Sequence, residues 1–236
     1  MLRQMVGRKP ENMKRTIVIL VLVCARLLTA EAQTLKFDFG KGKAEKGYLK
    51  VLPETIFSQE LGYGIDLGTK VVTNSSVGKT ALTDGFLTSD HPFYFSVKLP
   101  EGNYNVKVWV GDDQGASDLA LRAENRRMFV NRLQTEKGKH QLVEFTVNIR
   151  DSLIAGSKSK VRLKSREYGY LHWDNKLTLE FNSTQPKINA IEITPNKEAV
   201  SVFLAGNSTV VDGGSEPFSA WGQMFPYFLN PVKWLL

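Results

Sequence analysis

The sequence predicts an all-β fold, an antiparallel β-sandwich, followed by the first strand, loop and helix of an α/β domain. Three observations lead to this prediction. Short runs of alternating apolar and polar residues recur from Thr34 to about Thr194, separated by Gly, Asn, Asp and Pro. No convincing helical pattern lies between these runs, and about ten such strands are typical of a two-sheet sandwich. After Pro195 the pattern changes to a continuous apolar run and then to helical spacing.

The first strand is expected over Thr34–Gly40, TLKFDFG, where apolar side chains at alternate positions line one face. Phe93–Pro100 and Tyr104–Gly111 repeat this alternation, and the Pro100-Glu-Gly-Asn103 stretch between them predicts a hairpin turn. Roughly 160 residues are enough for a core between two sheets. The other strand candidates are Asp118–Glu124, Arg126–Asn131, Gln141–Ile149, Lys160–Ser165, Lys176–Asn182 and Ile188–Thr194.

The last part of the sequence predicts a different architecture. Ala199–Gly206, AVSVFLAG, is almost continuously apolar, as in a parallel strand buried on both faces, and it runs into a tight turn. A helix is then expected with Ser215 as N-cap and Pro217 in its first turn. Its apolar face would be formed by residues spaced three or four apart, Phe218, Trp221, Phe225 and Phe228. We therefore expect a sandwich over residues 33–194 and the beginning of an α/β domain over residues 195–236.

Residues 1–32 have the composition of an export signal. Met13-Lys-Arg gives a basic start, residues 16–24 (TIVILVLVC) an apolar core, and residues 30–32 (AEA) a cleavage pattern. The apolar core is shorter than the roughly 20 residues that span a bilayer. We expect translation to begin at Met13, residues 1–32 to be removed, and the mature protein to be secreted or periplasmic without membrane attachment.

Charge and cysteine content exclude several classes of function. The formal net charge is +7, residues 1–32 contribute +4 of it, and the remainder is spread without a basic stripe, so no nucleic-acid partner is expected. The only cysteine, Cys24, lies in the signal, which leaves no zinc site or cysteine nucleophile. The stretch Gly111–Gly115, GDDQG, lacks the spacing of a calcium loop and is expected to be a solvated turn. We predict no metal and no cofactor.

Two segments carry a resemblance to known families. The stretch VFLAGNSTV (Val202–Val210), together with AWGQMFP (Ala220–Pro226), resembles the nucleophile segment of the SGNH or GDSL-type hydrolases, with most similarity to the rhamnogalacturonan acetylesterase group. The sandwich part, with KFDFG, GYGIDL and HWDNKLTLEFN, resembles the galactose-binding-like domain that precedes such esterases in exported bacterial enzymes. The resemblance implies a carbohydrate esterase that removes acetyl groups from a pectic polysaccharide or oligosaccharide.

The resemblance assigns Ser208 as the nucleophile, with its own backbone N–H as an oxyanion donor and Gly206 and Asn207 as part of the motif. Asn207 stands where the family has Asp. The family's base is a histidine in a later Asp-x-x-His block, whereas His91, His140 and His172 all precede Ser208. A serine hydroxyl is a poor nucleophile without a base. The sequence therefore predicts that the chain as printed is inactive, and that it is the first part of a truncated esterase.

Other interpretations stay open at this point. Ser208 could lie in an ordinary turn, or His172 could act as its base from the sandwich. Trp173, Asp174 and Asn175 could contact carbohydrate, since rings stack on sugars and polar groups bind hydroxyls; alternatively Trp173 belongs to the core and the other two to a turn. The alternative function is a non-catalytic sandwich module that binds carbohydrate or has a structural role.

Overall fold

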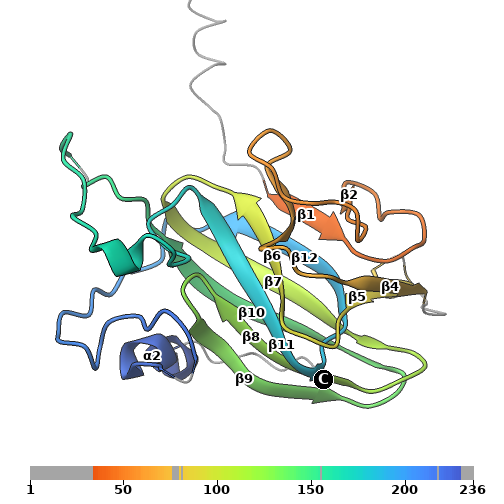
Figure 1. The fold of residues 1–236 in the computed structure, drawn as a ribbon. Coiled ribbons are helices and arrows are strands. Elements are labelled where there is room, and N and C mark those ends of the chain that lie inside the picture. Colours follow the sequence, from red (N-terminus) through yellow and green to blue (C-terminus); the bar gives the residue numbers. More distant parts are fainter. Residues whose placement is uncertain (1–33, 76–79, 81, 155, 217, 230–236) are drawn as a thin grey trace, which may run out of the picture. The chain divides into compact units, whose positions relative to one another are not determined.

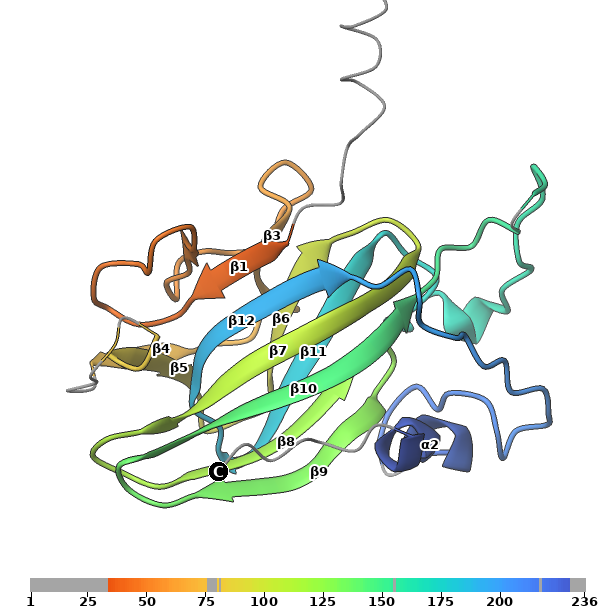
Figure 2. The ribbon, with the colours of Figure 1, turned by 180° about the vertical axis from the view of Figure 1, so that it is seen from behind.

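The computed structural model describes residues 34–75, 80, 82–154, 156–216 and 218–229. They belong to one compact unit, Thr34–Leu236, and a second unit covers Met1–Gln33. The predicted export signal, its start at Met13 and Cys24 lie outside the described residues. Figures 1 and 2 show that the first unit is built from two stacked sheets, so the predicted all-β sandwich is confirmed.

One sheet has seven strands. Its main path is β10-β7-β12-β1-β2, with β5 beside β12 and β4 beside β5. All neighbours are antiparallel except β1 and β2. The strands are β1 (Leu35–Asp38), β2 (Leu49–Lys50), β4 (Val72–Ser75), β5 (Gly85–Thr88), β7 (Gly102–Asp112), β10 (Lys139–Ile149) and β12 (Ile188–Pro195).

The other sheet has five antiparallel strands in the order β3-β6-β11-β8-β9. They are β3 (Tyr63–Asp66), β6 (Phe93–Lys98), β8 (Ser117–Ala123), β9 (Arg127–Thr135) and β11 (Lys176–Gln185). Strand β9 forms one edge of this sheet, and helix α2 (Trp221–Leu229) packs against it (Figure 1).

Alternating side chains of both sheets fill the space between them. Phe37 of β1 and Phe39, the residue directly after β1, both contact Phe95 of β6 in edge-to-face geometry, with ring centroids 5.0 Å apart. All three rings are fully buried. Because one sheet supplies Phe37 and Phe39 and the other supplies Phe95, these contacts hold the two layers together.

Two predictions about the sandwich are wrong. The turn at residues 100–103 does not close a hairpin, because β6 and β7 belong to different sheets and the turn carries the chain from one sheet to the other. The expected strand Lys160–Ser165 is not formed; Lys160 makes a single bridge to Leu153, and a short 3-10 helix (Ser165–Glu167) follows. This segment lies outside both sheets, so its alternating residues have no neighbouring strand to pair with.

The C-terminal segment also departs from the prediction. Ala199–Gly206 forms no strand and no other regular structure, and Phe203 is 69% exposed. A strand buried on both faces needs strands beside it and helices over it, and the described residues provide neither. Helix α2 (Trp221–Leu229) is formed, but it starts later than expected. The Gln223 side chain accepts a hydrogen bond from the Ala220 N–H at 3.0 Å, which makes Ala220 the N-terminal cap.

Candidate functional site

The predicted nucleophile position lies in a tight turn that presents Ser208 to solvent. The Asn207 side-chain oxygen accepts hydrogen bonds from the Thr209 N–H at 3.0 Å and the Thr209 hydroxyl at 2.8 Å. The Val210 N–H donates to the Asn207 carbonyl at 3.0 Å and closes the turn. The Asn side chain thus orders the backbone around Ser208, a task that needs an oxygen acceptor but no negative charge.

The start of α2 is seated directly on this turn. The Trp221 N–H donates to the Thr209 carbonyl at 3.1 Å. A Cβ atom on Gly222 would lie 2.1 Å from the Val210 carbonyl oxygen, so only glycine permits this approach. The turn that carries Ser208 and the helix therefore form one local unit.

The structure brings one histidine to the C-terminal segment. His172 Nδ1 lies 3.4 Å from the Asp212 carboxylate, and Arg127 Nε lies 3.5 Å from the same oxygen. His140 contacts Asp113 at 3.2 Å, between β7 and β10. Among the residues that the structure describes, no hydrogen bond joins Ser208 to a histidine. The geometry therefore gives Ser208 no general base within the described part of the chain.

Left-handed backbone angles and a carboxyl with a raised pKa occur where the sandwich contacts the C-terminal segment. Glu124, Arg126 and Trp173 have φ angles of 56°, 62° and 63°, in the left-handed region that non-glycine residues avoid. Glu124 is 2% exposed. Burial raises the pKa of its carboxyl to about 8, while the charge of Arg127 opposes the shift. Strain together with a perturbed carboxyl is a combination often found at functional sites.

Trp173, Asp174 and Asn175 form the turn that leads into β11. The Trp173 ring meets His172 edge-on, with centroids 5.5 Å apart. The Lys176 N–H donates to the Asp174 carboxylate at 3.0 Å, and the Asn175 amide donates to the Gln59 side chain at 3.3 Å. Burial raises the pKa of Asp174. These side chains have protein partners, and their role in carbohydrate contact stays a prediction.

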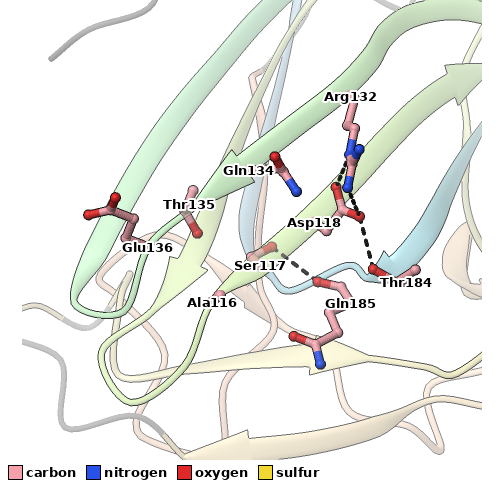
Figure 3. Close-up of a pocket in the computed structure, with 9 residues that line it drawn as sticks. All are labelled: Ala116, Ser117, Asp118, Arg132, Gln134, Thr135, Glu136, Thr184 and Gln185. Carbon is pink, nitrogen blue, oxygen red and sulfur yellow. Dashed lines mark hydrogen bonds and ion pairs between the residues drawn. The ribbon is translucent and has the colours of Figure 1, made fainter.

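A hollow of about 590 Å³ lies at the far end of β9, away from Arg127 (Figure 3). At its centre Arg132 donates to the Asp118 carboxylate through two nitrogens, at 3.0 and 3.3 Å. The Ser183 and Thr184 hydroxyls each donate to the same carboxylate at 2.9 Å. Burial raises the pKa of Asp118, but these hydrogen bonds outweigh burial and hold the pKa below its usual value.

Several polar groups of the hollow have no protein partner. Within the described residues, the Thr135 hydroxyl is buried without a hydrogen bond, and no bond is made by the side-chain amides of Gln134 and Gln185. Amides and hydroxyls both donate and accept, so the hollow suits a ligand rich in hydroxyl groups. The sequence prediction missed this site. The available signal was a run of four polar residues, Asn182–Gln185, directly after the apolar part of β11.

In the described ranges, no three His, Cys, Asp or Glu side chains come together as metal ligands. No helix among these same residues is long and apolar enough to cross a bilayer.

Comparison with known proteins connects this fold to an esterase-related family. The family model described as "Beta-agarase/YXIM esterase-like, galactose-binding domain-like" matches residues 35–161. The "Uncharacterized esterase YxiM" of Bacillus subtilis (strain 168) is 23% identical over 229 residues, which cover 92% of this chain and 54% of that protein. The match therefore reaches beyond residue 161 into the C-terminal segment, and the chain spans about half the length of this relative.

Solved structures give a likeness of fold. The crystal structure of the YxiM protein from Bacillus subtilis is similar at a TM-score of 0.50 and 22% identity, covering 83% of this chain and 51% of that chain. A β-glucuronidase from Bacteroides uniformis has a TM-score of 0.45 at 10% identity, covering 70% of this chain and 18% of that chain.

Proposed function

Because the chain belongs to the beta-agarase/YXIM esterase-like, galactose-binding domain-like family, we propose that it is the part of an exported carbohydrate esterase that carries the sandwich and the nucleophile. Ser208 is the proposed nucleophile, and acetyl esters on a pectic polysaccharide such as rhamnogalacturonan are the proposed substrate. The relative that matches 92% of the chain is named as an esterase, and this observation carries the proposal.

The geometry of the Ser208 turn supports the assignment. The Asn207 side chain and the Thr209 carbonyl fix the backbone on both sides of the serine. Ser208 itself is exposed and open to a polymeric substrate. Ester hydrolysis also needs a general base and oxyanion donors. With no histidine bonded to Ser208 in the described residues, we propose that the 236-residue chain has no esterase activity by itself.

Two experiments test this proposal. The recombinant chain is assayed on nitrophenyl acetate beside its Ser208→Ala variant, and equal rates are expected. A clearly faster wild-type rate would contradict the proposed inactivity. The gene is also sequenced downstream of codon 236, where the proposal expects an open frame with an Asp-x-x-His block. A continuing frame without that block would contradict the esterase assignment.

A second candidate function is binding of carbohydrate by the sandwich itself. The hollow at the end of β9 favours it, because unpaired amides and a buried hydroxyl surround a neutralised Asp118–Arg132 pair. The lining contains no aromatic ring, so recognition would depend on hydrogen bonds to hydroxyl groups.

Calorimetric titration of the chain with pectic oligosaccharides tests this candidate. Gln134→Ala should weaken binding, whereas Trp173→Ala should leave it unchanged. If Trp173→Ala weakens binding and Gln134→Ala does not, the carbohydrate site lies at the turn that contains Trp173. If none of the three proteins binds, the module has no carbohydrate function.

A further inference from the structure

The C-terminal segment is held on the sandwich by a polar interface of unusual composition. The turn between β8 and β9, Ala123–Arg127, contacts the stretch Asp212–Gln223 that follows Ser208. We infer that this turn, which we name the latch turn, positions the Ser208 segment, with Asn125 and Gln223 as the principal positioning residues. The significance for Ser208 rests on the proposed function; the positioning itself does not.

Asn125 forms three hydrogen bonds, two through its side chain and one through its backbone carbonyl. Its side-chain amide donates to the Gly213 carbonyl at 3.1 Å, and its side-chain oxygen accepts the Leu171 N–H at 3.3 Å. Its backbone carbonyl accepts a hydrogen bond from the Gln223 side chain at 2.7 Å. Asn125 is 2% exposed. One residue thus joins β8–β9, the loop before β11 and the C-terminal segment.

Gln223 completes the connection from the helix side. Its amide donates to Asn125 and also to the Gly213 carbonyl at 3.2 Å, while its oxygen accepts the Ala220 N–H. Gln223 is 0% exposed, yet Trp221 and Phe228 of the same helix are 51% and 75% exposed. The helix therefore turns its polar residue toward the sandwich. Because hydrogen bonds need defined distances and angles, this contact fixes the orientation of α2 on the sandwich as well as holding it there.

Charged residues of the sandwich contact the start and the middle of the same stretch. Arg127 of β9 lies 3.5 Å from the Asp212 carboxylate, and Arg126 donates to the Phe218 carbonyl. His172 adds a contact to Asp212 at 3.4 Å. Arg122 pairs with Glu216 at 2.6 Å. The sandwich thus reaches the stretch at its start, middle and end.

The backbone of the latch turn is itself strained and fixed. Glu124 and Arg126 adopt left-handed φ angles, which persist only where surrounding contacts determine them. The Glu124 N–H donates to the Thr178 carbonyl at 2.8 Å, and the Arg126 N–H donates to the Glu124 carbonyl at 2.7 Å. A turn held in this way presents Asn125 in one orientation.

The connection reaches Ser208 in few steps. Gln223 fixes the first turn of α2, the Trp221 N–H at its start bonds the Thr209 carbonyl, and Thr209 is part of the turn that presents Ser208. The latch turn therefore acts on the nucleophile turn through α2, without touching Ser208.

Amide hydrogen exchange of the full chain, followed residue by residue, tests this inference. Gln223→Glu keeps the oxygen that caps Ala220 and removes the two donated bonds. Asn125→Asp keeps the acceptor for Leu171 and removes the donor to Gly213. Gln223→Met removes the donors without adding charge. Asn131→Asp, at an exposed position of β9, is the matched control.

Leaving a buried carbonyl unpaired shifts a local opening equilibrium by about ten- to a hundredfold. The amides of Val210, Phe218 and Trp221 should therefore exchange about ten- to a hundredfold faster in all three variants. Amides of β7 and β10 should be unchanged in these variants, and the amides of Val210, Phe218 and Trp221 should be unchanged in Asn131→Asp. Unchanged exchange at the three amides, or an equal acceleration throughout the sandwich, would overturn the inference. Because the readout needs no catalysis, failure of the esterase assignment would leave it intact.

Discussion

The buried carboxyl of Glu124 predicts an unusual dependence of stability on pH. Burial raises its pKa from 4.5 to about 8, with opposition from the charge of Arg127. Between these values the folded protein keeps the proton and the unfolded chain releases it. Since the folded state binds more protons, the free energy of unfolding falls as pH rises from about 4.5, and this loss ends near pH 8.

The perturbation is Glu124→Gln, which cannot ionise and keeps an oxygen to accept the Thr178 N–H, a bond of 3.2 Å in the wild type. One pH unit inside the window changes the free energy of unfolding by about 1.4 kcal/mol. From pH 5 to pH 7 the wild type should therefore lose about 3 kcal/mol relative to the variant.

Urea unfolding followed by tryptophan fluorescence measures this difference at pH 5, 6, 7 and 8. Glu136→Gln, at an exposed glutamate after β9, is the control and should follow the wild-type profile. If the profiles of Glu124→Gln and wild type run parallel to within about 0.5 kcal/mol, the carboxyl ionises as in the unfolded chain. The inferred environment of the latch turn would then be wrong.

Three further predictions concern the core, strand β3 and the N-terminus. Phe95→Ala removes a fully buried ring between the sheets and should lower the free energy of unfolding by about 3–5 kcal/mol; an unchanged urea midpoint would contradict the described packing. Gly64→Ala places a Cβ 2.4 Å from the Phe57 nitrogen at a φ of 148°. It should destabilise the protein by at least about 1 kcal/mol, whereas an equal or higher melting temperature would show that β3 does not have this backbone. Expression in an exporting bacterium, followed by N-terminal sequencing, should yield a protein beginning at Gln33. An exported protein whose sequence still begins at Met13 would contradict cleavage.

Most strands of the sandwich were predictable because their pattern is local. The alternation of apolar residues in Thr34–Gly40 and Tyr104–Gly111 identifies β1 and β7 without reference to the rest of the chain. Pairing is not local. Pro100-Glu-Gly-Asn103 specifies a chain reversal but not the sheet to which each flanking strand belongs, and β6 and β7 separate into different layers. Ala199–Gly206 shows the same limit, because apolar content alone does not supply a neighbouring strand.

The contacts of the candidate site likewise divide into local ones, which the sequence could predict, and long-range ones, which it could not. The turn at Ser208 was predictable because Asn207 acts on residues two and three positions away. The Asn125–Gln223 bond joins residues 98 positions apart in the chain, and the contact of Asp212 with His172 also joins residues distant in sequence. Such contacts depend on how α2 lies against β9, which no local pattern encodes. The hollow near Asp118 combines three strand ends and was missed for the same reason.

The proposed role of Ser208 is that of the nucleophile of a carbohydrate esterase. The most direct measurement is acetate released from acetylated rhamnogalacturonan by the polypeptide purified from its native host, wild type against a chromosomal Ser208→Ala variant. We expect acetate release to fall by at least about a thousandfold in the variant, as when a triad serine is removed. Equal acetate release by both proteins would contradict the claim.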